Sequence, residues 1–520
     1  MKIRDDVVSA HACCSAHALS RRSFMIRSSA LAGSAVALSA ARPSATPIDS
    51  TALDPASFLQ PLKVKPVLVY EISERRPATS WRPWGGLHTE QDAAAEQRRI
   101  EGELSRMKSA AEFPLEILPL EPVRNPQQAA AIAGGPQDLT LMYAASGSGK
   151  TLETLASPAR WNLIFVRHRS GPVYLWYEIA HPRFLRKTVD EYGQPGMGVE
   201  DVVVDSHEDV LWRLRALYGL KNTLGKKIVA VGGASGWGAG GRQAPDISRA
   251  TWKFQMVDVP YPALGERLKA ARADAALLRR TSAEAEEYLQ RPGVTLETSK
   301  PFFVNAFLLR AVLRDLLAEA RTDAITINHC MGTIMPMAET TACLPLSLLN
   351  DQGFLAFCES DFVVIPSGVL LHYISGKPVF FNDPTYPHHG LVTLAHCTAP
   401  TKLDGRNAEP VRILTHFESD YGAAPKVEMK KGQVVTNIVP DFACKKWVGF
   451  EGAILDSPFL DICRSQVDVE IRGDGELLLR EMRGFHWMMS YGSYLKETGY
   501  ALKKLGIEWL DLSQAGQRVS

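Results

Sequence analysis

Residues 302–328 read FFVNAFLLRAVLRDLLAEARTDAITIN. The long apolar run predicts a helix over Phe302–Ala320, and the short β-branched run after it predicts a strand over Ala324–Asn328. The same alternation precedes this stretch, with a predicted strand at Lys227–Val231 and a predicted helix at Leu264–Leu289. Strands that alternate with helices form parallel sheets covered by helices on both faces. The sequence therefore predicts an α/β fold for this part of the chain.

The alternation extends towards the N-terminus, where Leu139–Ala144 and Trp161–Val166 are predicted strands, and a strand is also expected at Val173–Tyr177. From about Gly390 the pattern changes to short β-rich runs such as Val411–Phe417. A chain of 520 residues is too long to fold around a single hydrophobic core. We therefore predict an α/β protein with two Rossmann-like parallel-sheet α/β domains, residues 61–222 and 223–385, followed by a mostly β C-terminal domain, residues 386–520.

The composition excludes several classes of protein. The 520 residues carry 58 Lys and Arg against 57 Asp and Glu, a formal net charge of +1, which argues against a protein that coats nucleic acid. Hydrophobic residues are 46% and charged residues 22%, as in soluble globular proteins. No apolar run after the N-terminus is long enough to span a membrane. We expect no nucleic-acid partner and no membrane span in the mature chain.

The N-terminus has the layout of a targeting segment. Arg21 and Arg22 precede Phe24, an Ala-rich stretch runs over Ser28–Ala41, and small residues end it. This order is typical of a twin-arginine export signal. The alternative is a chance Arg-Arg pair before an ordinary helix. The sequence predicts a signal over residues 1–41, a linker over 42–60, recognition by the twin-arginine machinery and a periplasmic or secreted protein.

The cysteines form no C-x-x-C pair, so neither a zinc ribbon nor a dithiol redox motif is indicated. Cys13 and Cys14 belong to the predicted signal. Four of the others lie in apolar segments and are predicted to be buried free thiols, although an oxidising compartment leaves a disulfide open. The six cysteines of the mature chain are Cys330, Cys343, Cys358, Cys397, Cys444 and Cys463.

The segment Ala144–Thr151, AASGSGKT, resembles a phosphate-binding loop after a strand, with Lys150 placed for terminal phosphates. Its first glycine is replaced by alanine, and Ser157-Pro158 interrupts the helix that should follow. A strand-to-helix turn rich in small residues is the favoured interpretation.

The segment Gly236–Gly241 matches G-x-G-x-x-G after the strand at Lys227–Val231. The loop continues through Gln243 and Pro245, so we expect no helix start where a pyrophosphate would need one. Dinucleotide binding is disfavoured on this ground.

A different group of residues indicates metal chemistry. Glu339, Glu359, Asp361 and a distant His486 offer the oxygen and nitrogen ligands that Mn²⁺ or Mg²⁺ accepts. Glu359 and Asp361 are two residues apart, so on a strand both side chains would point into one pocket. The alternative is that these acids are solvated surface residues, as scattered acids usually are.

The order and spacing of several segments resemble the L-fucose/L-arabinose isomerase superfamily over essentially the whole mature chain. The resemblance is strongest over 324–400 and 484–508 and weak before 140. The segments that carry it are Glu339, CLPLSLL at 343–349, CESD at 358–361, LLHYISGKPVF at 370–380, Asp383-Pro384, LAHCTAP at 394–400, and HWMMSYG at 486–492.

This resemblance implies a sugar isomerase that interconverts aldoses and ketoses through a cis-enediol at a Mn²⁺ site. By position, Glu339, Asp361 and His486 are the implied metal ligands, and Glu339 and Asp361 the implied acid and base. Glu359 and His396 are implied sugar-pocket or supporting residues. The family also implies a trimer-based homo-oligomer.

Two positions depart from the family pattern. Many members have Lys where this chain has His329, and a His-His pair where it has Phe485-His486. His329 is therefore either a substrate-site residue or a satisfied core histidine. The competing functions are a non-catalytic carbohydrate-binding protein on the same fold and a nucleotide-dependent enzyme that uses Lys150.

Overall fold

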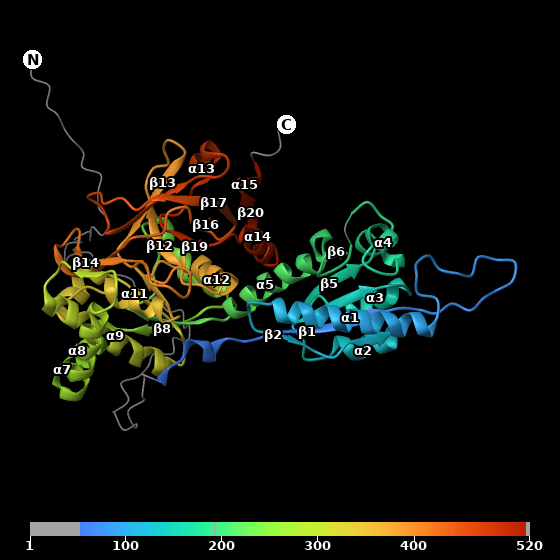
Figure 1. Ribbon diagram of the computed structural model, residues 1–520, viewed down its shortest axis with the longest axis horizontal. Helices are drawn as coiled ribbons and strands as arrows, with labels where there is room; N and C mark the ends of the chain where they lie inside the picture. The colour runs from blue at the N-terminus through green and yellow to red at the C-terminus, as the bar shows by residue number, and fades with distance from the viewer. Residues whose placement is uncertain (1–51, 192, 516–520) are drawn as a thin grey trace, which may run out of the picture.

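The computed structural model describes residues 52–191 and 193–515. The predicted signal over 1–41 lies outside the described residues. The end of the predicted linker is ordered by contacts: Pro55–Phe58 form a short 3-10 turn, and Gln60 exchanges two hydrogen bonds with the side chain of Asn222. Figure 1 shows an α/β unit at one end of an elongated molecule, with the long green helix α5 (His207–Thr223) leading to the remaining elements.

The first unit is built on a six-stranded parallel sheet, and its strand order is β2-β1-β4-β5-β6 with β3 paired to β1. Helices α1, α2, α3 and α5 pack beside these strands (Figure 1). The strands are β1 (Leu62–Val69), β2 (Leu115–Ile117), β3 (Glu121–Val123), β4 (Leu139–Ala144), β5 (Trp161–Val166) and β6 (Val202–Val204), and the helices are α1 (Glu90–Ala110), α2 (Pro126–Ala133), α3 (Gly149–Leu155) and α4 (Leu175–Ile179).

The second unit is a four-stranded parallel sheet with the order β11-β10-β7-β8. Strands β10 and β11 are buried along their whole length, as expected for strands of a sheet covered on both faces. The strands are β7 (Lys227–Val231), β8 (Gln255–Val259), β10 (Ala324–Ile327) and β11 (Leu355–Cys358), and the helices are α6 (Ala244–Thr251), α7 (Tyr261–Ala273), α8 (Ala275–Leu289), α9 (Lys300–Ala320), α10 (Met335–Ala338), α11 (Cys343–Asp351) and α12 (Ile365–Ser375).

The C-terminal region is mostly β. Six of its strands follow one another in the order β16-β19-β12-β13-β18-β17, and β16 pairs with β17, so the sheet closes into a six-stranded barrel. Strand β20 extends the sheet beside β17, and β9 (Val294–Leu296) joins β14 and β15 in a small separate sheet. The strands are β12 (Phe380–Pro384), β13 (Leu391–His396), β14 (Val411–His416), β15 (Tyr421–Val427), β16 (Val434–Val439), β17 (Lys446–Asp456), β18 (Ser465–Glu470), β19 (Trp487–Tyr491) and β20 (Glu508–Asp511), and the helices are α13 (Gly475–Glu481), α14 (Leu495–Lys503) and α15 (Leu512–Ala515).

The mixed α/β class with parallel α/β regions and a mostly β C-terminal region is therefore confirmed. Strand β12 belongs to the barrel, so the barrel begins before the expected boundary at residue 385. The strand expected at Val173–Tyr177 is wrong, because Leu175–Ile179 form the helix α4 with Trp176 buried against Phe184. The helix expected over Leu264–Leu289 is two helices, since Asp274 caps the second by accepting bonds from its first backbone N–H groups.

Among the described residues, no helix combines the length and the apolar character needed to cross a membrane.

Candidate metal centre

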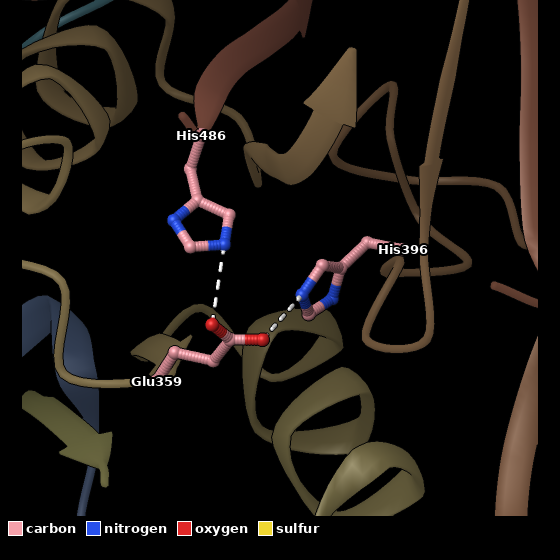
Figure 2. Close-up of side chains that lie close together, drawn as sticks. All are labelled: Glu359, His396 and His486. Atoms are coloured by element: carbon pink, nitrogen blue, oxygen red, sulfur yellow. Dashed lines mark ion pairs between the residues drawn. The ribbon is translucent and has the colours of Figure 1, made fainter. Parts of the chain in front are cut away.

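The centre lies where the carboxyl edge of the second sheet meets the barrel. Glu359 and Asp361 follow strand β11, while Asp383 and His396 lie in the last residues of β12 and β13. His486 directly precedes β19. Figure 2 shows both imidazoles turned towards the carboxylate of Glu359. Two units of the fold thus contribute to one cluster.

A tight turn presents the two acids that follow β11. Glu359 and Ser360 both have left-handed backbones, with φ of 61° and 48°, a conformation that non-glycine residues seldom adopt. The turn is fixed by main-chain bonds to Ser235 on both sides and by Thr326, whose hydroxyl accepts from the N–H of Ser360 at 3.1 Å. Glu359 and Asp361 therefore lie in a turn and not on a strand, and the turn directs both towards His486.

Asp361 fixes the orientation of His486. Its Oδ2 lies 2.7 Å from Nδ1 of His486, and both residues are fully buried. Its Oδ1 accepts from the N–H groups of Trp237 and Val363, each at 3.1 Å. Since the carboxylate of Asp361 accepts hydrogen bonds, the Nδ1 of His486 is the donor in their contact. The other ring nitrogen, Nε2, is left for a different partner.

The Nε2 atom of His486 faces the carboxylates of Glu359 and Asp383. Nε2 of His486 is 3.3 Å from Oε2 of Glu359 and 3.2 Å from Oδ1 of Asp383. A neutral imidazole with its proton on Nδ1 would direct a lone pair at these negative oxygens, and that contact is unfavourable in a buried site. A proton on Nε2 or a metal ion between the three groups removes the repulsion.

The pKa values of His486 and Glu359 also indicate that the cluster favours a positive charge at the position of His486. Burial opposes the charged form of His486, but Glu359, Asp361 and Asp383 together raise its pKa well above the usual value. Burial alone would raise the pKa of Glu359. The attraction of His486 and His396 for the carboxylate is stronger, so the pKa of Glu359 lies well below its usual range. In the absence of a metal, the charged pair of His486 and Glu359 is the favoured state.

His396 completes a set of three possible ligands. Donor atoms of Glu359, His396 and His486 all lie within 4.8 Å of one another. His396 Nε2 is 3.8 Å from Oε1 of Glu359, and its Nδ1 contacts the hydroxyl of Thr398 at 2.9 Å. Two imidazoles and a carboxylate, with Asp383 beside them, suit a borderline divalent ion such as Mn²⁺, Fe²⁺ or Zn²⁺.

Aromatic side chains shield the cluster. Phe381 packs against both imidazoles, with ring centroids 4.8 Å from His396 and 4.4 Å from His486. On the other side, Phe485 stacks on Trp237 at 3.9 Å. Trp237 is 36% exposed, so the cluster lies beneath an aromatic surface that solvent partly reaches.

The structure does not bring Glu339 to this cluster. Its side chain is 60% exposed, its carboxylate lies 3.4 Å from Nη2 of Arg272, and it directly follows the short helix α10. His329 lies two residues after the end of β10 and is exposed, so its interpretation as a core histidine is wrong. Of the predicted residues, Glu359, Asp361, His396 and His486 lie together.

Asp383 belongs to the cluster but is not among the predicted site residues. It belongs to the acid- and histidine-rich stretch seen in the sequence, and it directly precedes a proline at the end of a strand. Its approach to His486 depends on the antiparallel pairing of β12 with β19, in which Asn382 lies opposite Trp487. Because β12 and β19 are far apart along the chain, the sequence does not predict that they pair.

The two glycine-rich motifs have structural explanations. Helix α3 ends at Leu155, before Ser157-Pro158 as expected, and Lys150 is 73% exposed with its ammonium 3.6 Å from Glu153. At Gly236–Gly241 the expectation of no helix is wrong. A 3-10 turn runs directly into α6, and Pro245 fits the first helical turn, where a missing N–H costs nothing. A Cβ on Gly236 would lie 2.1 Å from the carbonyl oxygen of Gly241, so the glycines allow close backbone packing.

The prediction that four of the six cysteines are buried is confirmed. Cys330, Cys343, Cys358 and Cys397 are buried, whereas Cys444 and Cys463 are partly exposed.

Comparisons with known proteins add no family assignment. No protein-family model matches the sequence, and a search of curated proteins found no significant match.

Proposed function

We propose that this chain is a metal-dependent sugar isomerase, which interconverts an aldose and a ketose through a cis-enediol. One observation carries the proposal: the Nε2 of a fully buried His486 faces the carboxylates of Glu359 and Asp383 while Asp361 holds its Nδ1. Imidazole nitrogens oriented by a carboxylate on the far side are typical of protein metal ligands.

The donor set fits a divalent cation, with Mn²⁺ as the expected ion. Glu359, His396 and His486 would hold it, since their donor atoms already lie close together. The bound ion would polarise the sugar oxygens and thereby acidify the C–H beside the carbonyl group.

The residues of the chain supply the rest of the reaction. Asp383 is the proposed proton carrier between the two sugar carbons, because its carboxylate is next to the ligands and its side chain retains 13% exposure. Asp361 is a positioning residue, since both of its oxygens are already engaged and it is fully buried. Phe381 keeps water from the inner side of the ligands.

Glu339 has no part in this proposal within a single chain, which differs from what the family resemblance implies. The Rossmann-like character of the two α/β units, export by the twin-arginine route and a homo-oligomeric state remain parts of the proposal that follow from the sequence.

The decisive experiment combines metal analysis with a proton-exchange assay. Purified protein should contain about one divalent ion per chain, and NMR in D₂O should detect exchange at C2 of an accepted aldose. Asp383→Asn should abolish exchange while the metal is retained, and Asp246→Asn serves as the control because Asp246 is an exposed acid on α6. Absence of metal in both purified and reconstituted protein would refute the proposal.

A second candidate is a non-catalytic carbohydrate-binding protein. The exposed position of Glu339, away from the cluster, favours it, because one implied acid is then missing from the centre. Sugar binding by calorimetry without exchange, in metal-loaded protein, would support this candidate over the isomerase.

A further inference from the structure

Helices α8 and α9 enclose a second cavity, separate from the candidate metal centre. The two helices pack against each other in the lower left of Figure 1, and the cavity between them has a volume of about 370 Å³. That volume is within the range of small-molecule sites. Its charged lining consists of four arginines and two glutamates: Arg280, Arg291, Arg310, Arg314, Glu284 and Glu287.

The positive charge of this cavity is only partly neutralised. Glu284 is shared, because its carboxylate pairs with both Arg280 and Arg310. The Cζ of Arg291 lies 4.7 Å from the ring centroid of Tyr288, and its charge attracts the nearby buried carboxyl of Asp351, whose pKa burial nevertheless raises. Four guanidinium groups against two carboxylates favour an anionic ligand.

Two buried donors that line the cavity lack acceptors among the described residues. Tyr288 is 5% exposed and Arg310 is 8% exposed. The hydroxyl of Tyr288 and the Nε of Arg310 have no hydrogen-bond partner among the residues that the structure describes. Buried donors are rarely left unpaired, so each such group calls for an explanation.

Neighbouring acids do not supply the missing acceptors. Asp351 acts electrostatically on Tyr288, but its oxygens accept from the N–H of Thr401, the hydroxyl of Thr401 and the N–H of Lys402. Burial lowers the pKa of Arg310, with the attraction of Glu284 opposing that shift. A bound anion would therefore stabilise the positive charge of Arg310, which Glu284 neutralises only in part.

We infer that this cavity binds a phosphate group, carried by a small phosphate monoester or present as the free ion, with Arg291, Arg310 and Tyr288 as its donors. Guanidinium groups pair with phosphate oxygens through two parallel bonds, and phosphate accepts several donors at once. The cavity is larger than the bare ion, which leaves room for the organic part of a monoester.

The test is calorimetric titration of the full chain in low-salt buffer, with inorganic phosphate and glucose 6-phosphate as separate probes. Arg291→Gln should weaken phosphate binding by about tenfold or more, and Tyr288→Phe by about two- to tenfold, because the first removes a charged donor and the second a neutral one. Arg279→Gln is the matched control, since Arg279 is exposed on α8, the helix that carries Tyr288, and does not line the cavity. It should change the affinity by less than about twofold.

Each outcome decides the inference. Tighter binding of glucose 6-phosphate assigns the site to a monoester, and equal binding assigns it to the free ion. No binding of either probe up to roughly 10 mM overturns the inference, and so does an equal loss in Arg279→Gln and Arg291→Gln. If Arg291→Gln fails to fold, Tyr288→Phe carries the test, because it keeps the ring that packs on Phe303 and Phe307.

Discussion

Replacing Asp361 by Asn tests the role of the carboxylate behind His486. Asn keeps an oxygen for the N–H groups of Trp237 and Val363, so its amide nitrogen takes the place of Oδ2, 2.7 Å from Nδ1. The amide then donates to Nδ1, and a neutral imidazole carries its proton on Nε2 instead. The nitrogen that faces Glu359 is thereby blocked as a ligand. The variant should fold, because both backbone donors keep an acceptor.

The expected size of the effect follows from this change of tautomer. Loss of a carboxylate that orients a ligating histidine lowers metal affinity by about 10- to 100-fold, which corresponds to about 1.4–2.8 kcal/mol. Calorimetric titration of Mn²⁺ into chelator-treated protein measures the affinity, and ¹⁵N shifts of the His486 ring report the tautomer. Asp246→Asn controls for loss of an exposed carboxylate. The reasoning is refuted if Asp361→Asn binds Mn²⁺ within about threefold of wild type, or if the ring proton stays on Nδ1.

The metal-free protein should be most stable between the ordinary pKa values of its buried pair. The raised pKa of His486 gives stability that is present below pH 6.5 and lost as pH rises, whereas the lowered pKa of Glu359 gives stability that is present above pH 4.5 and lost as pH falls. Urea midpoints across this range should decline on both sides, and His486→Gln should flatten the alkaline side; an unchanged profile contradicts the assignment. Glu339→Gln should leave the Mn²⁺ content of the protein unchanged, because its exposed carboxylate pairs with Arg272 rather than with the cluster; elemental analysis showing loss of the ion would restore Glu339 as a ligand. Lys150→Ala should leave sugar turnover within a few-fold of wild type, since Lys150 is exposed and paired with Glu153; a loss of roughly a hundredfold would restore the nucleotide-dependent alternative.

The parts of the fold that the sequence predicts are those with local causes. Strands β4, β5 and β7 have the expected bounds, because each is a continuous apolar run between turns. Helix α1 likewise has a local cause for its start at Glu90, because Thr89 and Asp92 form a capping box. Barrel closure is different, since it depends on pairing β16 with β17 and β19 with β12 in a register that no local pattern contains.

The same limit applies to the centre. Residue types and order point to Asp361 and His486, and the structure places them in direct contact. The distinction between a ligand and the residue that orients it depends on which imidazole nitrogen each acid meets. That choice is made by the left-handed backbone at Glu359 and Ser360, a conformation for which these residue types carry no signal.

The closed barrel also determines when the centre can exist during synthesis. Strand β19 lies between β12 and β16, and His486 is 125 residues beyond Asp361 along the chain. Contacts between such distant segments form late, because loop closure precedes any stabilising contact. A nascent chain that has reached only β13 therefore holds Glu359 and His396 without their third partner. If the proposed function holds, metal uptake would follow synthesis of a nearly complete chain, and a truncation before residue 486 should yield protein that does not acquire the ion, however much of the first two units has folded.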